Sequence, residues 1–600
     1  MMNPGIADTC KREARTLKAV DLVCRTPGDA RKRRGWWGIC EPPAGMRGPA
    51  GYPQGTRLAF GAWMWVFILF VNAWVFLLPQ VAAALPIVTV SLVPEKERLV
   101  VAYRFSTPVT RLALRPQNSE ERLNHWEVIP PVLLEGNSIR RHDGKAFDRL
   151  VVTVQPDKYE FGGYPEFLHA RSTWIINLAY LLPAKKSVSA IRLRLPDKIP
   201  VIIDGGCRNL HGIVPIDRIG HSHFLLMSKD KDVITGQGGT CAAFLGKRLE
   251  PFIRTILKDT SQFLDRLLYQ RNSQFLVIVD ERTSAAHFFQ RGSVDAHETV
   301  LLQLYGQRWL RMSEAQIRRY LDPFLSHELA HVWEDGASIS LTDSAHPWFW
   351  EGAAEFAALQ YLEEKGRDDL ALWQRHVTAC RMVVGRRFSD SDFGRSRAEA
   401  YGCGTLFFLA SDWLLRKRGA YPEGFFAFYR AMIASKTSGQ TPTIHMLLDS
   451  LLGTDPIYRK LVRGEMEQNW NFFLSAFAAK GIAARETPMQ DQALVTESWL
   501  APMMRSLCTG PSGYWQDARW YVLDAPRSRC KLSGARRRID SVNGVNFLRN
   551  PVPARQIVVR ACRQERSILL SGPGKLPPLT VPCHFVVRPV PSDLQLFRQR

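Results

Sequence analysis

Two histidines four residues apart, with a glutamate beside the first, are the residues of this sequence whose spacing most directly indicates chemistry. They form the segment His327-Glu328-Leu329-Ala330-His331. Positions i and i+4 share one face of an α-helix, so both imidazoles can hold the same metal ion. Glu328 lies next to that face and can accept a proton from a water at the metal. The segment therefore predicts a metal centre that carries its own base.

A third metal ligand is expected from a second helix that begins after Pro347. This helix carries Glu351, and nineteen residues lie between His331 and Glu351, which is enough for a turn and a returning helix. Two histidines and one glutamate leave a coordination position open for water, as in catalytic rather than structural zinc sites. Glu355 lies one turn further on the same face. It is expected either to accept the N–H of a ligand imidazole or to be a solvated surface charge.

Together these motifs resemble those of the gluzincin metallopeptidases, in particular the membrane alanyl aminopeptidase and glycyl aminopeptidase branches. The resemblance rests on His327–His331 and on Trp348-x-x-Glu351-Gly352-x-Ala354. In those branches the second motif reads W-x-x-E-G-x-x, and the gap before it is usually one residue shorter than here. The resemblance implies a thermolysin-like, mainly helical catalytic domain with a small sheet. It also implies one zinc ion per chain and hydrolysis of peptide bonds by a zinc-activated water.

The same resemblance assigns roles outside the zinc motifs. Tyr401-Gly402-Cys403-Gly404 opens an apolar helix where these branches have Y-x-x-G, whose tyrosine donates a hydrogen bond to the oxyanion. Tyr401 takes that role or is a packing tyrosine. The branches also have a Gly-rich edge strand that ends in a glutamate holding the substrate amine. Residues 292–298 depart from that pattern and offer Asp295 or Glu298, so aminopeptidase and endopeptidase activity both stay open.

The apolar pattern predicts an α+β chain of several domains. Residues 85–240 are interpreted as an N-terminal antiparallel, sandwich-like β-domain, because β-branched runs alternate with Gly, Pro, Asn and Asp. Residues 241–490 have helical periodicity and are assigned to the peptidase domain. Within them, 274–280 predicts a buried strand and 299–304 a strand at the edge of the sheet.

The helix that carries the two histidines is expected to begin at Asp322-Pro323, as N-cap and first helical position. It is expected to end at Gly336, since glycine commonly follows a helix.

Residues 491–600 predict a small, β-rich C-terminal domain. Ile539-Asp-Ser-Val-Asn-Gly544 resembles the I-x-x-V-N-G turn of PDZ domains, a module that glycyl aminopeptidase relatives often carry at this place. A plain β-hairpin with Asn-Gly at its turn explains these residues nearly as well.

The N-terminal segment, residues 1–84, predicts export. Residues 59–78 form a continuous apolar run, followed by small residues that offer a cleavage site after Ala83 or Ala84. Cleavage would release the chain into the periplasm or the extracellular space, whereas an uncleaved run would anchor it in a membrane. Met46, rather than Met1, would give a leader of ordinary length.

The cysteine content agrees with export. Three of the 11 cysteines lie within residues 1–84 and eight follow, and an even number in an exported chain predicts disulfides. Pairing of sequence neighbours is the simplest arrangement, with bonds 207–241, 380–403, 508–530 and 562–583.

The net charge of the chain bears on the class of partner that it binds. The net charge of +22 suits polyanions, but the export signal and the lack of a basic helix with interleaved aromatic residues disfavour a nucleic-acid partner. We expect an exported, zinc-dependent metallopeptidase that takes a peptide or protein as its substrate. The alternative is a peptide- or protein-binding module on a catalytically weak peptidase scaffold.

Overall fold

The computed structural model describes residues 85–599 apart from several gaps. The gaps are 116–121, 123–124, 130, 158–166, 171, 204–209, 217–223, 231–233, 238–239, 272–274, 284, 286–287, 295–298, 337–346, 368, 392, 395, 420, 435–454, 488–491, 509–512, 517–519, 525–529, 531–536, 574–576, 588–589 and 591. The predicted leader with its apolar run 59–78 therefore lies outside the described residues. Of the helices that are described, none is both long and apolar enough to cross a bilayer.

The N-terminal strands form three sheets that share one apolar core. A six-stranded sheet has the order β12-β10-β1-β2-β7-β4, a four-stranded sheet the order β11-β13-β9-β8, and a three-stranded sheet the order β3-β6-β5. The strands are β1 (Ile87–Glu95), β2 (Arg98–Val109), β3 (Arg111–Ala113), β4 (Trp126–Val128), β5 (Val132–Glu135), β6 (Ser138–Arg141), β7 (Phe147–Val154), β8 (Phe167–Ala170), β9 (Thr173–Asn177), β10 (Ala190–Arg194), β11 (Val201–Ile203), β12 (Ile213–Pro215) and β13 (Phe224–Ser228), with the short helices α4 (Leu178–Leu181) and η2 (Lys185–Ser187).

One strand pair departs from the antiparallel arrangement that the sequence predicts. β1 and β10 run parallel, with Ile87 opposite Ala190, while the other pairs of the six-stranded sheet are antiparallel. The expectation of a purely antiparallel domain is wrong at this pair. β10 returns from far along the chain, so no hairpin turn fixes its direction.

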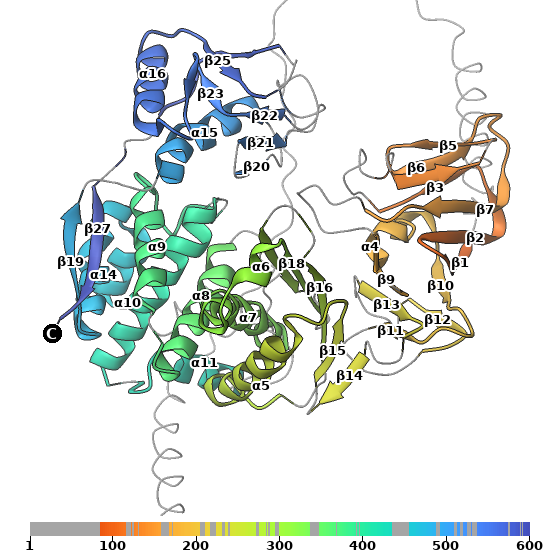
Figure 1. Ribbon diagram of the computed structural model, residues 1–600, viewed down its shortest axis with the longest axis horizontal. Helices are drawn as coiled ribbons and strands as arrows, with labels where there is room; N and C mark the ends of the chain where they lie inside the picture. The colour runs from red at the N-terminus through yellow and green to blue at the C-terminus, as the bar shows by residue number, and fades with distance from the viewer. Residues whose placement is uncertain are drawn as a thin grey trace, which may run out of the picture. The chain divides into compact units, whose positions relative to one another are not determined.

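A five-stranded sheet of order β14-β15-β16-β18-β17 lies next to the helices of the central region, residues 250–479 (Figure 1). Its strands are β14 (Ile234–Gln237), β15 (Thr240–Phe244), β16 (Phe275–Arg282), β17 (Phe289–Val294) and β18 (Thr299–Tyr305). Val277 and Val279 of β16 belong to the core shared with the helices, whereas Leu276 and Ile278 pack against the four-stranded sheet. Both faces of β16 are thus buried, which confirms the strand predicted at 274–280.

The edge of this sheet is not where the sequence predicts it. Residues 299–304 form β18, which pairs with β16 on one side and β17 on the other. The edge assignment is therefore wrong, and its physical reason is that every residue of β18 is buried. The strand at the edge is β17, which contains Gly292.

The described helices of the central region have the following bounds: α5 (Glu250–Leu267), α6 (Arg308–Arg311), α7 (Glu314–Gly336), α8 (Pro347–Glu364), α9 (Leu370–Arg381), the π-helical turn η4 (Ala398–Cys403), α10 (Gly404–Lys417), α11 (Phe425–Ala434), α13 (Pro456–Arg463) and α14 (Met466–Ala479). The start of α8 at Pro347 and the end of α7 at Gly336 agree with the sequence-based prediction.

The predicted start of α7 is wrong, because Pro323 lies inside the helix. The helix instead begins after Ser313, which forms a capping box with Gln316: each backbone N–H donates to the other residue's side chain, over 2.9 and 3.4 Å. Asp322 does not cap, since its buried carboxylate pairs with Arg367. The hydroxyl of Ser326 donates to the Asp322 carbonyl over 2.6 Å in this turn.

The C-terminal region contains two small sheets, of orders β20-β21-β22 and β24-β23-β25-β26, together with two helices. The elements are α15 (Gln492–Leu507), β20 (Gly513–Gln516), β21 (Tyr521–Asp524), β22 (Arg537–Ile539), β23 (Ser541–Val542), β24 (Val545–Asn546), α16 (Pro551–Arg563), β25 (Ile568–Ser571) and β26 (Leu579–Val581). Asn543 and Gly544 join β23 to β24 with positive φ at both positions, as an Asn-Gly hairpin turn requires. The hairpin is confirmed, while a PDZ-like domain stays a prediction.

The last strand of the chain pairs away from these sheets. β27 (Asp593–Arg598) runs antiparallel to β19 (Ile482–Thr487), and the two lie side by side next to α9 and α14 (Figure 1). Three of the predicted disulfides are present, Cys380–Cys403, Cys508–Cys530 and Cys562–Cys583. Cys207 of the fourth lies outside the described residues. The domain boundaries stay a prediction.

Two glycines allow helices α8 and α10 to touch through their backbones. A Cβ added to Gly404 would lie 2.2 Å from the Trp348 carbonyl oxygen and 3.1 Å from the Cα of Gly352. Such distances leave no space for a side chain.

We therefore expect Gly404→Ala to force the helices apart and to lower the free energy of unfolding by roughly 1–3 kcal/mol, the usual cost of overpacking. Chemical denaturation of the metal-free protein measures this change. An unchanged denaturation midpoint would show that α8 and α10 do not meet at these glycines.

Candidate metal centre

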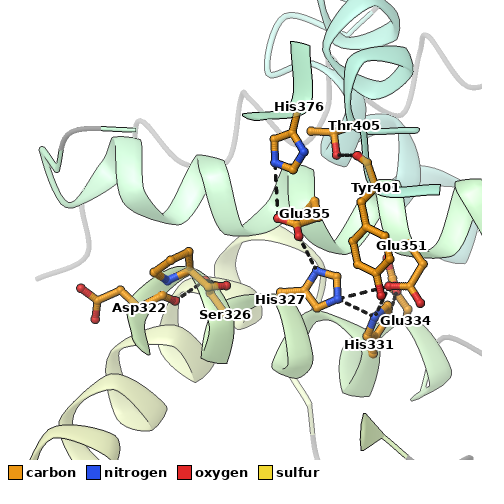
Figure 2. A network of polar contacts seen from close by, with 11 residues as sticks. Asp322, Ser326, His327, His331, Glu334, Glu351, Glu355, His376, Tyr401 and Thr405 are labelled. Atoms are coloured by element: carbon orange, nitrogen blue, oxygen red, sulfur yellow. Dashed lines mark hydrogen bonds and ion pairs between the residues drawn. The ribbon is translucent and has the colours of Figure 1, made fainter. Parts of the chain in front are cut away.

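Helices α7 and α8 bring three potential metal ligands together. Nε2 of His327 lies 3.2 Å from Nε2 of His331, and Oε2 of Glu351 lies 3.3 Å and 3.5 Å from these two nitrogens (Figure 2). Both imidazoles are buried and Glu351 is partly exposed. Among the described residues these three form the one group of three or more His, Cys, Asp or Glu side chains spaced to hold a metal ion.

The spacing of the three donor atoms fits a single small cation. A tetrahedral zinc ion with ligands at about 2.0–2.1 Å separates neighbouring donors by about 3.3–3.4 Å. The donors also need positive charge between them, because two imidazole nitrogens and a carboxylate oxygen present lone pairs to one another. Contacts with His327 and His331 lower the pKa of Glu351 despite the opposing effect of burial. The residues present therefore fit a divalent metal ion.

Two residues that are not among the predicted site residues contact the imidazole of His331. Its Nδ1 donates to Oε2 of Glu334 over 3.0 Å, and both side chains are buried. The indole of Trp350 stacks on the imidazole, with 4.6 Å between ring centroids and 9° between planes. Burial raises the pKa of Glu334, while the neighbouring His331 opposes that rise. Glu334 lies three residues after His331 on the same helix, so helical spacing alone identifies it as a candidate.

His327 has a carboxylate at its other ring nitrogen as well. Nδ1 of His327 lies 3.7 Å from Oε1 of Glu355, and Oε2 of Glu355 lies 3.5 Å from Nε2 of His376 on α9 (Figure 2). Burial alone would raise the pKa of Glu355, but His327 and His376 lower it to about 2. Glu355 is therefore ionised and lies between two imidazoles. This placement favours its predicted role as an acceptor for a ligand imidazole over that of a solvated surface charge.

Glu328 lies beside the three ligands and is nearly fully buried. Burial raises the pKa of its carboxyl, as suits a group that takes up and gives back a proton. Gly292, on the edge strand β17, packs directly against it. A Cβ at position 292 would lie 2.0 Å from both Cδ and Oε1 of Glu328, so the absent side chain makes room for the carboxylate.

Tyr401 lies over the first ligand histidine. Its ring stacks on that of His327 with 5.6 Å between centroids, and its hydroxyl points toward Glu351 (Figure 2). Burial and the negative charge of Glu351 raise the pKa of this phenol, so the hydroxyl keeps its proton and can donate it in a hydrogen bond. The π-helical turn that carries it is stabilised where Thr405 donates to the Tyr401 carbonyl over 2.5 Å.

The structure thus brings together six of the residues that the sequence singles out, and it adds three. His327, Glu328, His331, Glu351 and Tyr401 lie around one point with Glu355 behind them, while Glu334, Trp350 and His376 complete the surroundings. Asp295 and Glu298, the candidates for binding the substrate amine, lie outside the described residues. His376 had no sequence signal, because only the fold brings α9 to this place.

Comparison with known proteins shows the fold. The chain is similar to the structure of an aminopeptidase N family protein from Idiomarina loihiensis, with a TM-score of 0.51 and 11% sequence identity over 86% of this chain and 98% of that one. A weaker likeness, with a TM-score of 0.36 and 12% identity, covers 62% of this chain and 47% of Legionella pneumophila aminopeptidase A in complex with aspartic acid. No protein-family model and no curated sequence matches the chain. The fold of an aminopeptidase N family protein is therefore present without close sequence similarity.

The contact between Gly292 and Glu328 gives a test of the site. We expect Gly292→Ala to displace the Glu328 carboxylate while the metal ligands stay in place. If Glu328 serves as the general base of a peptidase, this displacement lowers turnover by about 10²-fold or more, the low end of the loss of such a base. Ser293→Ala, on the next residue of β17, is the matched control and should retain activity. Peptide cleavage and metal content of both variants decide the matter, and a fully active Gly292→Ala enzyme would contradict the geometry.

Proposed function

We propose that this chain is a zinc-dependent metallopeptidase. The observation that carries the proposal is the triangle of donor atoms from His327, His331 and Glu351, 3.2–3.5 Å on a side, next to the buried carboxyl of Glu328. Two histidines and one carboxylate are the ligand set of catalytic zinc sites that keep one position open. The shared fold with an aminopeptidase N family protein supports the same assignment.

The roles of the residues follow from their placement. Zinc, when bound, acts as a Lewis acid on the substrate carbonyl and lowers the pKa of water. Glu328 takes the proton from the attacking water on its carboxylate and passes it to the nitrogen of the leaving amine. Its raised pKa favours this exchange, because the carboxyl then holds a proton more readily than an exposed glutamate does.

Tyr401 and the two outer carboxylates complete the proposed machinery. The Tyr401 hydroxyl, which keeps its proton, donates a hydrogen bond to the oxygen on which negative charge develops. Glu334 and Glu355 each face the Nδ1 of one ligand imidazole. A proton held at Nδ1 leaves Nε2 free to bind metal, and it fixes the orientation of the ring.

We further propose that the enzyme is exported and acts on the amino end of peptides. Three disulfides support export, since such bonds form and persist in oxidising compartments. The fold of an aminopeptidase N family protein favours removal of amino-terminal residues. In this proposal Asp295 or Glu298 holds the substrate amine. The PDZ-like identity of the C-terminal region belongs to the same proposal, as does anchoring by residues 59–78 if the leader is not cleaved.

The decisive experiment separates metal binding from catalysis. Purified wild-type protein should contain about one zinc per chain and cleave peptides, His331→Ala should lose both properties, and Glu328→Gln should keep zinc but lose about 10²–10⁴-fold in turnover. Peptides with free and with acetylated amino ends distinguish an aminopeptidase, which cleaves only the former, from an endopeptidase. Full zinc content in His331→Ala would refute the ligand assignment. Zinc binding without any cleavage would favour a binding protein on a peptidase scaffold.

Tyr401→Phe tests the proposed oxyanion contact, because it removes one hydroxyl and little volume. If the hydroxyl meets the oxyanion only in the transition state, kcat should fall by about 10²–10³-fold while KM stays nearly constant. Steady-state kinetics measure both constants, with the Cys380–Cys403 bond verified by thiol titration in the same preparation. A rise in KM with unchanged kcat would make Tyr401 a substrate-binding residue, and no change in either would leave it a packing residue.

A further inference from the structure

His376 is a buried histidine for which the proposed reaction has no use. It lies on α9, whereas the three metal ligands come from α7 and α8. Its Nε2 is 3.5 Å from Oε2 of Glu355, and the other oxygen of the same carboxylate is 3.7 Å from Nδ1 of His327. One carboxylate thus stands between two imidazoles from different helices (Figure 2).

The two ligand histidines are supported in different ways. Glu334 reaches His331 from the same helix, three residues away, so the helix itself sets their separation. Glu355 must reach His327 across the boundary between α8 and α7. A glutamate side chain has several rotatable bonds, so a contact at one oxygen does not fix the direction of the carboxylate. A second nitrogen at the other oxygen does fix it.

The helix that carries His376 is held on the side of the C-terminal strand β27. The hydroxyl of Thr378 donates to the carboxylate of Asp593 over 2.9 Å, and the amide of Gln374 donates to the Leu594 carbonyl over 2.8 Å and accepts from the Leu596 N–H over 2.7 Å. One turn beyond His376, Cys380 is bonded to Cys403 in the turn that carries Tyr401. These links hold α9, and with it the backbone of His376, in place.

We infer that His376 is a positioning residue of the metal centre. It holds Glu355 in the orientation in which that carboxylate accepts the Nδ1–H of His327, and so it keeps Nε2 of His327 directed at the metal. The inference rests on the proposed zinc site and adds to it a residue that touches neither metal nor substrate. Loss of a group bonded directly to a ligand imidazole typically weakens metal binding by about 10–100-fold. His376 acts one contact further out, so we expect the low end of that range.

Zinc affinity, rather than activity, is the measurement that tests this role. We propose to determine the zinc dissociation constant of the full chain at fixed pH by competition with a chelator, together with the thermal unfolding of the metal-free protein. His376→Ala should bind zinc about 10-fold more weakly than wild type, the low end of the range for a group bonded to a ligand. His376→Gln places an amide N–H at about the position of Nε2 and should restore most of the affinity.

Thr378→Val is the matched control on the same helix. It removes the part-buried hydrogen bond to Asp593 without touching Glu355. The Gln374 contacts with β27 and the Cys380–Cys403 bond still hold α9 in this variant, so it should lower the unfolding temperature but leave the zinc affinity unchanged. Equal affinity of His376→Ala and wild type would overturn the inference, as would an equal loss in Thr378→Val or a His376→Gln variant no tighter than His376→Ala. If the wild-type protein itself bound no zinc, the proposed function would fail first, which separates the two failures.

Discussion

Three electron-rich atoms held within 3.5 Å of one another are the constraint on which the candidate metal centre depends. His327, His331 and Glu351 present lone pairs to a common point, so the arrangement is unfavourable unless positive charge stands between them. Protein groups normally move apart to avoid such a contact. Here α7, α8 and α10 share one apolar core, and Gly352 and Gly404 allow the backbones of α8 and α10 to touch. Such packing on helices favours a preorganised set of donors.

Three further carboxylates surround the metal-ligand atoms. Glu334 and Glu355 lie at the far nitrogens of the two imidazoles, and Glu328 is buried beside them. Burial would lower the pKa of both ligand histidines, yet the neighbouring carboxylates raise it, strongly for His331. The site therefore attracts positive charge at the imidazoles. Burying several carboxylates is costly unless cations or hydrogen bonds compensate them, which explains why each of the two outer carboxylates faces an imidazole.

How far the sequence predicts this structure depends on how far apart the interacting residues lie along the chain. The histidine pair and the helix after Pro347 were predicted because helical spacing is local, and Glu334 was within reach of the same reasoning. His376 was not, because α9 reaches Glu355 only through tertiary packing. Two of the errors have the same origin, because the pairing of β1 with β10 and the inner position of β18 depend on strands elsewhere along the chain. The third error is local: Ser313 and Gln316 form a capping box upstream of Pro323, and the sequence itself carries that signal.

This chain shares its fold with a protein to which it is only 11% identical, whereas a metal site requires its ligand atoms to be placed to a few tenths of an ångström. The two are compatible because fold and site depend on different properties. Apolar cores tolerate extensive substitution as long as volume and pattern are kept, so the layers of helix and sheet can persist while most side chains change. A metal centre tolerates no comparable change, since ligand distances must hold to about 0.2 Å. The fold therefore says little about chemistry by itself. The proposed peptidase activity is supported by this chain's own histidines and carboxylates, which converge where α7, α8 and η4 meet.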